Sequence, residues 1–165
     1  MHRERISFSE LSDASREHWP EATAEDGLIV PTIYRLHEHL SRLADNLFKT
    51  YDLQSAEFET LCALRNSPSP HCLTPTDIYR ALLVSSGGMT KILSRLEKKG
   101  LVGRPANLKD ARSRLVGLTV HGKVLVEAIM GQLLQQEAEL LSKTNKPEQL
   151  ELLLREWLKN IEEKE

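Results

Sequence analysis

The spacing of apolar residues predicts a long helix near the start of the chain. Between Ile29 and Tyr51 the apolar positions alternate three and four residues apart, which places them on one helix face. Pro31 fits the first turn, because a proline there loses no hydrogen bond. The preceding residues 1–26 are polar and punctuated, so we expect an arm with at most one short helix, anchored by Trp19.

Three shorter helical segments follow this long helix. Residues 54–65 repeat the helical spacing of apolar side chains. Thr74 followed by Pro75 predicts the start of a short helix that the threonine hydroxyl caps. After a turn at residues 84–86, a further helix should end at Gly100, a residue type that commonly terminates helices.

The pattern then changes to that of a β-hairpin followed by long helices. Two short runs, residues 101–105 and 113–118, flank a turn-rich loop at 106–112. Helical patterns follow at 119–142 and 147–163, the first capped by a threonine and the second opened by a proline. The predicted fold class is therefore mainly α with a small β-hairpin wing.

Composition agrees with a helical protein of ordinary domain size. The chain has 165 residues with only 5% aromatics, and leucine, a strong helix former, supplies most of the apolar mass. Two cysteines do not make a disulfide framework. The sequence shows neither a signal peptide nor an apolar run of membrane-spanning length, so we expect a cytoplasmic protein without a cofactor.

The net charge of −2 hides a strong asymmetry along the chain. Residues 74–123 hold ten basic and three acidic side chains, a local charge of +7, and the rest of the chain carries −9. A basic segment between acidic ends is typical of a protein that binds a polyanion such as nucleic acid.

The basic segment has the order helix, tight turn, helix, β-hairpin, which is typical of a winged helix-turn-helix. The second helix is expected in the major groove of double-stranded DNA. Met89, Ile92, Leu93 and Leu96 should pack inward, and the opposite face then offers hydroxyl and cationic groups to phosphates and base edges. Its paired glycines permit either close approach to DNA or tight packing on the preceding helix. The predicted DNA-binding residues are Thr74, Ser86, Gly87, Gly88, Thr90, Lys91, Ser94 and Arg95.

The loop of the hairpin adds a second basic surface. Arginine on a projecting wing suits a narrow minor groove, where the negative potential is enhanced. Asp110 cannot favour DNA through its charge, and we assign it to holding Arg112 or a neighbouring arginine in place. The predicted DNA-binding residues of the wing are Lys109, Asp110, Arg112 and Arg114.

These motifs together resemble the core of the MarR family of transcriptional regulators. The stretches LTPTDIYRALLVSSGGMTKILSRLEKKGLVGR and KDARSRLVGLTVHG carry the resemblance, which extends from about Gly27 to the C-terminus. Two positions depart from the family pattern: Gly88 stands where threonine is frequent, and Ala111 where a second arginine is common. Both departures bear on sequence preference or affinity and not on the fold.

The resemblance implies a two-fold homodimer that acts as a repressor on a pseudo-palindromic operator. Residues 27–53 and 120–165 would supply the dimerisation helices, and residues 54–119 the DNA-binding domain. The apolar face of the last helix supports a dimer independently, because it is too large for an exposed terminal helix. The predicted interface residues are Ile33, Leu36, Leu150, Leu154, Trp157, Leu158 and Ile161.

Family members usually respond to a small effector, often a phenolic or aromatic acid, bound between the dimer base and the DNA-reading head. The resemblance places such a site near Tyr34, His37, Leu40 and Phe58. A ligand would act by favouring the conformer whose recognition helices are wrongly spaced for the operator.

Other function classes find less support. The sequence holds no dinucleotide-binding, P-loop, serine-hydrolase or zinc-protease motif, so we do not expect an enzyme. His37 and His39 are two residues apart and point to different sides of a helix, which argues against a shared metal ion. A winged helix that has become a protein-interaction module would lose cations such as Lys91 and Arg112.

A thiol-based redox-sensing regulator of the same fold is the alternative that stays open. It would use Cys62 or Cys72. Cys62 lies on an apolar helix face, where buried and inert thiols are usual. Cys72 falls in a loop without a resolving cysteine nearby in sequence.

Replacing Arg112 with alanine should weaken DNA binding at least tenfold, or about 1.4 kcal/mol, because the wing would lose its minor-groove cation. The dimer should stay folded. Fluorescence polarisation with a labelled duplex measures the loss, and an unchanged affinity would remove the wing from the mechanism.

Overall fold

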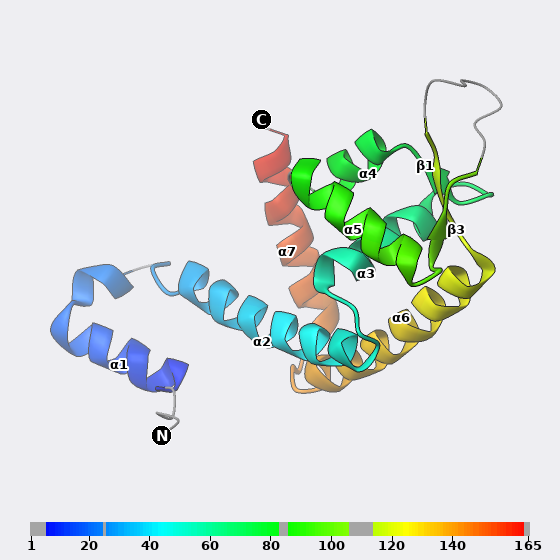
Figure 1. Ribbon diagram of the computed structural model, residues 1–165. Helices are drawn as coiled ribbons and strands as arrows, with labels where there is room; N and C mark the ends of the chain where they lie inside the picture. Colours follow the sequence, from blue (N-terminus) through cyan, green and yellow to red (C-terminus); the bar gives the residue numbers. More distant parts are fainter. Residues whose placement is uncertain (1–5, 25, 83–85, 106–113, 164–165) are drawn as a thin grey trace. The chain divides into compact units, whose positions relative to one another are not determined.

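The computed structural model describes residues 6–24, 26–82, 86–105 and 114–163 (Figure 1). The chain divides into two compact units, residues 1–46 and 47–165. Within the described ranges, no helix is both long and apolar enough to cross a membrane.

The first unit holds more helix than the sequence predicts for the arm. It comprises α1 (Phe8–His18), the short 3-10 helix η1 (Pro20–Thr23) and most of α2 (Ile29–Thr50). A capping box starts α1: Glu10 N–H donates to Ser7 Oγ at 3.1 Å, and Ser7 N–H donates to Glu10 Oε2 at 2.9 Å. The backbone bond from Ser7, followed by its side-chain bond, lowers the pKa of Glu10. The Ser-x-x-Glu spacing of Ser7 and Glu10 was a readable signal for this helix.

The second unit contains the remaining helices and a small sheet, with helix ends within a residue or two of the predicted ones. Each capping residue expected from the sequence lies where a helix begins or ends. The elements are α3 (Ser55–Asn66), β1 (Cys72–Leu73), α4 (Pro75–Leu82), α5 (Ser86–Lys98), β2 (Val102–Gly103), β3 (Val116–Leu118), α6 (Val120–Leu141) and α7 (Pro147–Glu162).

The sheet has three antiparallel strands in the order β1-β3-β2, one more strand than the predicted hairpin. Cys72 and Leu73 of β1 pair with Gly117 and Val116 of β3, and Val102 of β2 pairs with Leu118. β2 and β3 are shorter than the predicted runs at 101–105 and 113–118. The strand missed by the sequence analysis, β1, is held by pairing with residues more than forty positions away.

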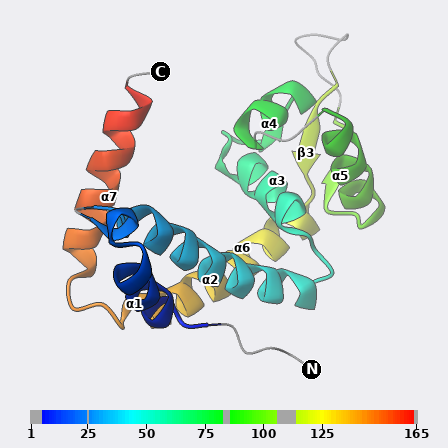
Figure 2. The same cartoon turned by 90° about the vertical axis from the view of Figure 1, so that its left-hand side faces the viewer.

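Helix α3 lies at the centre of the second unit. It contacts α4, α5, α6 and β3 (Figure 2), and its Leu61 and Leu64 are fully buried. Burial of this kind contributes about 1.5–3 kcal/mol for each large apolar side chain. The other fully buried apolar residues come from every neighbouring element, and they are Ile78, Leu96, Leu101, Val116, Val126 and Ile129.

The junction between α5 and α6 is closely packed. The Thr119 hydroxyl caps α6 by accepting from Gly122 N–H at 2.9 Å, and it donates to Gly100 O at 2.7 Å. Thr119 N–H donates to Leu101 O at 3.1 Å. Gly122 is needed here, because a Cβ atom at this position would lie 2.0 Å from Leu101 O.

Two glycines of α6 should therefore respond in opposite ways to alanine. Gly122→Ala should destabilise the fold by about 2 kcal/mol or more, because the new methyl group collides with the Leu101 carbonyl. Gly131→Ala should stabilise it by about 0.5–1 kcal/mol, because a Cβ there meets nothing within 4 Å. Urea unfolding measures both changes, and a Gly122→Ala variant as stable as the wild type would contradict this packing.

Candidate nucleic-acid interface

Helices α4 and α5 form the helix-turn-helix that the sequence predicts. Thr74 caps α4: Asp77 N–H donates to its Oγ1 at 3.2 Å, and the Thr74 hydroxyl donates to Asp77 Oδ2 at 2.6 Å. Pro75 is the first residue of the helix, as predicted. The Thr74 hydroxyl, one of the predicted DNA contacts, thus already has two bonds within the protein.

Helix α5 has the two faces that its sequence predicts. Met89, Leu93 and Leu96 are at most 3% exposed, and Ile92 is 9% exposed. The opposite side carries exposed hydroxyl and cationic side chains, and the predicted helical phase is therefore confirmed. The exposed residues there are Thr90, Lys91, Ser94, Arg95 and Lys98.

The end of α5 is fixed by a Schellman motif around Gly100. Its φ of +67° favours glycine, and Gly100 N–H donates to Glu97 O at 2.9 Å. Leu101 N–H donates to Leu96 O at 3.0 Å, and both leucines are buried. These bonds anchor the helix next to the sheet and define its direction.

Ion pairs lie along both edges of α5. On the side of the strands, Arg104 Nε is 3.6 Å from Glu97 Oε2. On the side of α3, Arg95 Nε is 2.9 Å from Oε1 of Glu57, a residue that is fully buried. Neither Glu57 nor Arg104 is recognisable from the sequence, because the cationic partners of Glu57 are distant in sequence and Arg104 lies beyond the end of the helix that carries Glu97.

Part of the predicted interface lies outside the described residues. This holds for Lys109, Asp110 and Arg112 of the wing. Ser86 and Gly87 lie in the first turn of α5, and only their place in the helix is described. Arg114 is exposed where the chain enters β3, and Gly88 is half-buried within α5.

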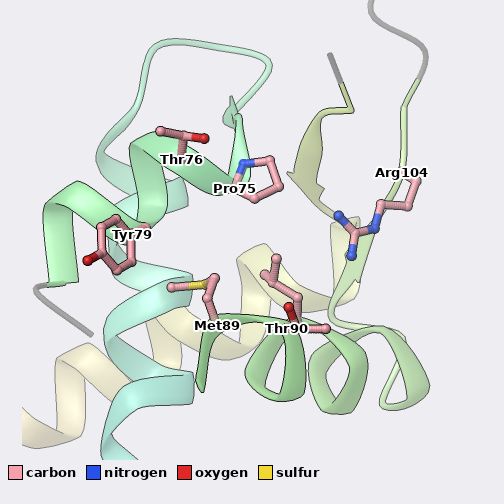
Figure 3. Close-up of a pocket in the computed structure, with 7 residues that line it drawn as sticks. Pro75, Thr76, Tyr79, Met89, Thr90 and Arg104 are labelled. Atoms are coloured by element: carbon pink, nitrogen blue, oxygen red, sulfur yellow. The ribbon is translucent and has the colours of Figure 1, made fainter. Parts of the chain in front are cut away.

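A pocket of about 320 Å³ lies between α4 and α5 (Figure 3). Its walls come from α4, α5 and the segment after β2, and Arg104 reaches toward it from the strand side. The mixture of apolar surface, hydroxyl groups and one guanidinium suits a small molecule with an apolar body and a negative group. The lining residues are Pro75, Thr76, Tyr79, Met89, Thr90, Leu93 and Arg104.

The effector residues expected from the sequence belong to both units. Tyr34, His37 and Leu40 are exposed on α2 in the first unit. Phe58 belongs to the second unit, where it is 4% exposed and its ring stacks on Phe48 with 4.4 Å between centroids. Phe58 is thus a core residue in this structure.

The expected interface residues are largely uncovered in the single chain. Leu36 is 52% exposed, and Ile33 is half-buried. Helix α7 contains no buried residue, although large apolar side chains recur along it. Its exposed members of the expected interface are Leu150, Leu154, Trp157, Leu158 and Ile161.

The comparisons with known proteins agree with this site. A family model described as the MarR family matches residues 51–113. The multiple antibiotic resistance protein MarR of Escherichia coli strain K12 is 33% identical over 129 residues, which cover 76% of this chain and 88% of MarR.

The chain belongs to the MarR family. The HTH-type transcriptional regulator PecS of Dickeya dadantii is 28% identical over 147 residues, or 89% of each chain. A solved structure of a mutant E. coli MarR complexed with operator DNA covers 87% of this chain and 97% of its own, with 30% identity and a TM-score of 0.64. The fold is thus the winged helix-turn-helix of a DNA-binding transcription regulator.

The match to the MarR family covers the elements that build the interface. Residues 51–113 run from the end of α2 through α3, α4, α5 and β2. The match includes both positions at which the sequence departs from the family pattern, Gly88 and Ala111. Within the described part of this MarR-family chain, no group of three or more His, Cys, Asp or Glu side chains could hold a metal ion.

The two cysteines have environments that disfavour a redox-sensing MarR regulator. Both are free thiols. Burial, together with the nearby charge of Glu59, raises the pKa of Cys62 to about 11. Burial also raises the pKa of Cys72. Since the thiolate is the reactive form, both shifts slow oxidation at neutral pH.

Cys62 should therefore resist alkylation in the folded protein. At pH 7.5 its reaction with iodoacetamide should be about a hundredfold slower than in the urea-unfolded chain, because its thiolate forms only as the pH approaches about 11. Mass spectrometry of labelled peptides measures the rate across pH. Equal labelling of folded and unfolded chains at neutral pH would revive the redox alternative.

Proposed function

We propose that this MarR-family chain is a repressor that binds a pseudo-palindromic DNA operator as a homodimer and is released by a small effector. The observation that carries the proposal is the division of α5 into a buried apolar face and an exposed face of cations and hydroxyls. A helix anchored in this way can enter the major groove as a rigid reader.

The exposed residues of α5 divide into two kinds of contact. Lys91 and Lys98 carry the flexible charges that suit phosphate oxygens. Thr90 and Ser94 carry short hydroxyl groups that suit base edges. The wing residues Lys109, Asp110, Arg112 and Arg114 would add contacts in the neighbouring minor groove, with Asp110 orienting an arginine.

A homodimer would explain the uncovered apolar side chains of α2 and α7. Trp157 is 42% exposed and Leu158 is 55% exposed in the single chain. Apolar area of this extent on a soluble protein usually marks an interface. A two-fold axis through helices of residues 27–53 and 120–165 would place two α5 helices about 34 Å apart, which is one turn of DNA.

The effector is proposed to be a small phenolic or aromatic acid. One candidate site includes Tyr34, His37 and Leu40, whose side chains are accessible on α2. The pocket beside α5 is a second candidate, because a carboxylate there could pair with Arg104 while its ring packs on Met89. A ligand bound at either place would act by stabilising a dimer whose recognition helices do not fit the operator spacing.

The first experiment is a salt titration of DNA binding. The purified chain should bind a labelled duplex from its own upstream region with two chains per site. The logarithm of affinity should fall linearly with the logarithm of salt concentration, with a slope of about −0.9 for each phosphate contacted. Lys91→Gln should make this slope shallower by about 0.9, because one phosphate contact is lost.

Lys143→Gln is the matched control, since it also removes one exposed lysine. Lys143 follows the C-terminal end of α6, a 22-residue helix about 33 Å long whose other end joins the sheet. The salt slope of the Lys143→Gln variant should equal that of the wild type. Failure to bind any duplex at low salt would overturn the proposed function.

A further inference from the structure

A buried acidic residue of α3 faces the C-terminal end of α5, the recognition helix of the proposed function. Glu57, in the first turn of α3, is 0% exposed. Its Oε2 accepts a hydrogen bond from Gln54 N–H at 2.9 Å and lies 3.6 Å from Lys99 Nζ. Its Oε1 lies 2.9 Å from Arg95 Nε. One carboxylate thus faces two cations at the C-terminal end of α5.

The same lysine also reaches the turn before α3. Lys99 Nζ donates to Asp52 O and lies 3.2 Å from Asp52 Oδ2. Asp52 has a φ of +52°, which turns the chain from α2 into α3. We call these four residues, Asp52, Glu57, Arg95 and Lys99, the helix clamp.

The contact between Glu57 and Arg95 is electrostatic more than a well-aligned hydrogen bond. The distance is short, yet among the described residues no donor is aimed at Oε1 with hydrogen-bonding geometry. A buried carboxylate without nearby positive charge would be costly, because it has lost its hydration. The carboxylate therefore favours positions of α5 that keep both cations close to it.

Arg95 lies at the edge of the exposed face of α5, where its guanidinium pairs with Glu57 of α3 although the side chain is 45% exposed. Arg95 and Lys99 are four residues apart, on the edge that contacts α3. Lys91 and Lys98 are exposed and form no ion pair within the described part of the chain, whereas the side chain of Lys99 is only 23% exposed. Arg95 near the end of α5 and Lys99 just after it are thus both paired with Glu57.

We infer that Glu57 is a positioning residue that sets the tilt of α5 for base reading, and that Arg95 anchors this helix to α3 instead of binding a phosphate. The inference rests on the proposed function. Hydrogen bonds to base edges form only within a narrow range of distances and angles, whereas the electrostatic attraction between cations and phosphates tolerates small changes in the tilt of α5. Loss of the clamp should therefore reduce operator preference more than it reduces general affinity for DNA.

Arg95→Gln, compared with Lys91→Gln, tests this inference. Each change removes one charge from an exposed position of the same helix. Arg95→Gln should lower the ratio of operator to random-duplex affinity about fivefold or more and leave the salt slope on random duplex unchanged. Lys91→Gln should make that slope shallower by about 0.9. If Arg95→Gln makes the slope shallower by the same amount and leaves the ratio unchanged, Arg95 is a phosphate contact and the inference fails.

Glu57→Gln tests the acid with an isosteric change. The variant should lose operator preference, and its random-duplex slope should steepen by up to about 0.9 because Arg95 is released. The double variant Glu57→Gln with Arg95→Gln should return the slope to the wild-type value. An unchanged operator preference and slope in Glu57→Gln would overturn the inference.

Hydrogen exchange provides a readout that needs neither DNA nor a stable Glu57→Gln chain. In Arg95→Gln the amides near the C-terminal end of α5 should exchange faster, while those of α6 keep wild-type rates. Unchanged exchange in α5 would overturn the clamp. If the wild type and Lys91→Gln show no DNA binding while exchange in α5 responds to Arg95→Gln, the proposed function fails and the clamp stands as a fold contact.

Discussion

Burial of the apolar face of α5 is the constraint on which the reading surface depends. Leu93 and Leu96 are almost completely removed from water, and each contributes about 1.5–3 kcal/mol by being so. Any rotation of α5 about its axis would expose part of this face. The polar side chains on the opposite side of α5 therefore keep one direction, and DNA meets a surface that is already ordered.

The total charge of this surface does not show which of its cations are paired within the protein and which are available to DNA. The basic segment carries +7, yet some of its cations are paired within the protein. Arg95 and Lys99 face Glu57, and Arg104 lies near Glu97. A count of basic residues thus overstates the charge available to DNA, and the exposed lysines of α5, Lys91 and Lys98, matter more than the total.

The helices could be predicted from the sequence because their signals are local. Thr74 and Gly100 act within a few residues of themselves, and the spacing of Met89, Ile92, Leu93 and Leu96 fixes the helical phase. The two-residue strand β1 could not be predicted, since it has no alternation to recognise and exists only through pairing with β3. Glu57 escaped notice for the same reason, because its cationic partners are 38 and 42 positions further along the chain.

The bonds around Thr119 have a consequence for how such a protein can diversify. The carbonyl oxygens of Gly100 and Leu101 accept hydrogen bonds from Thr119. The chain that leaves the C-terminal end of α5 therefore returns to that end immediately before α6 begins. The segment between Leu101 and Thr119 therefore has its two ends joined by hydrogen bonds. Changes of length or sequence at its tip need not be transmitted to either helix. A wing built between these two ends can therefore vary in sequence without changing the direction of α5.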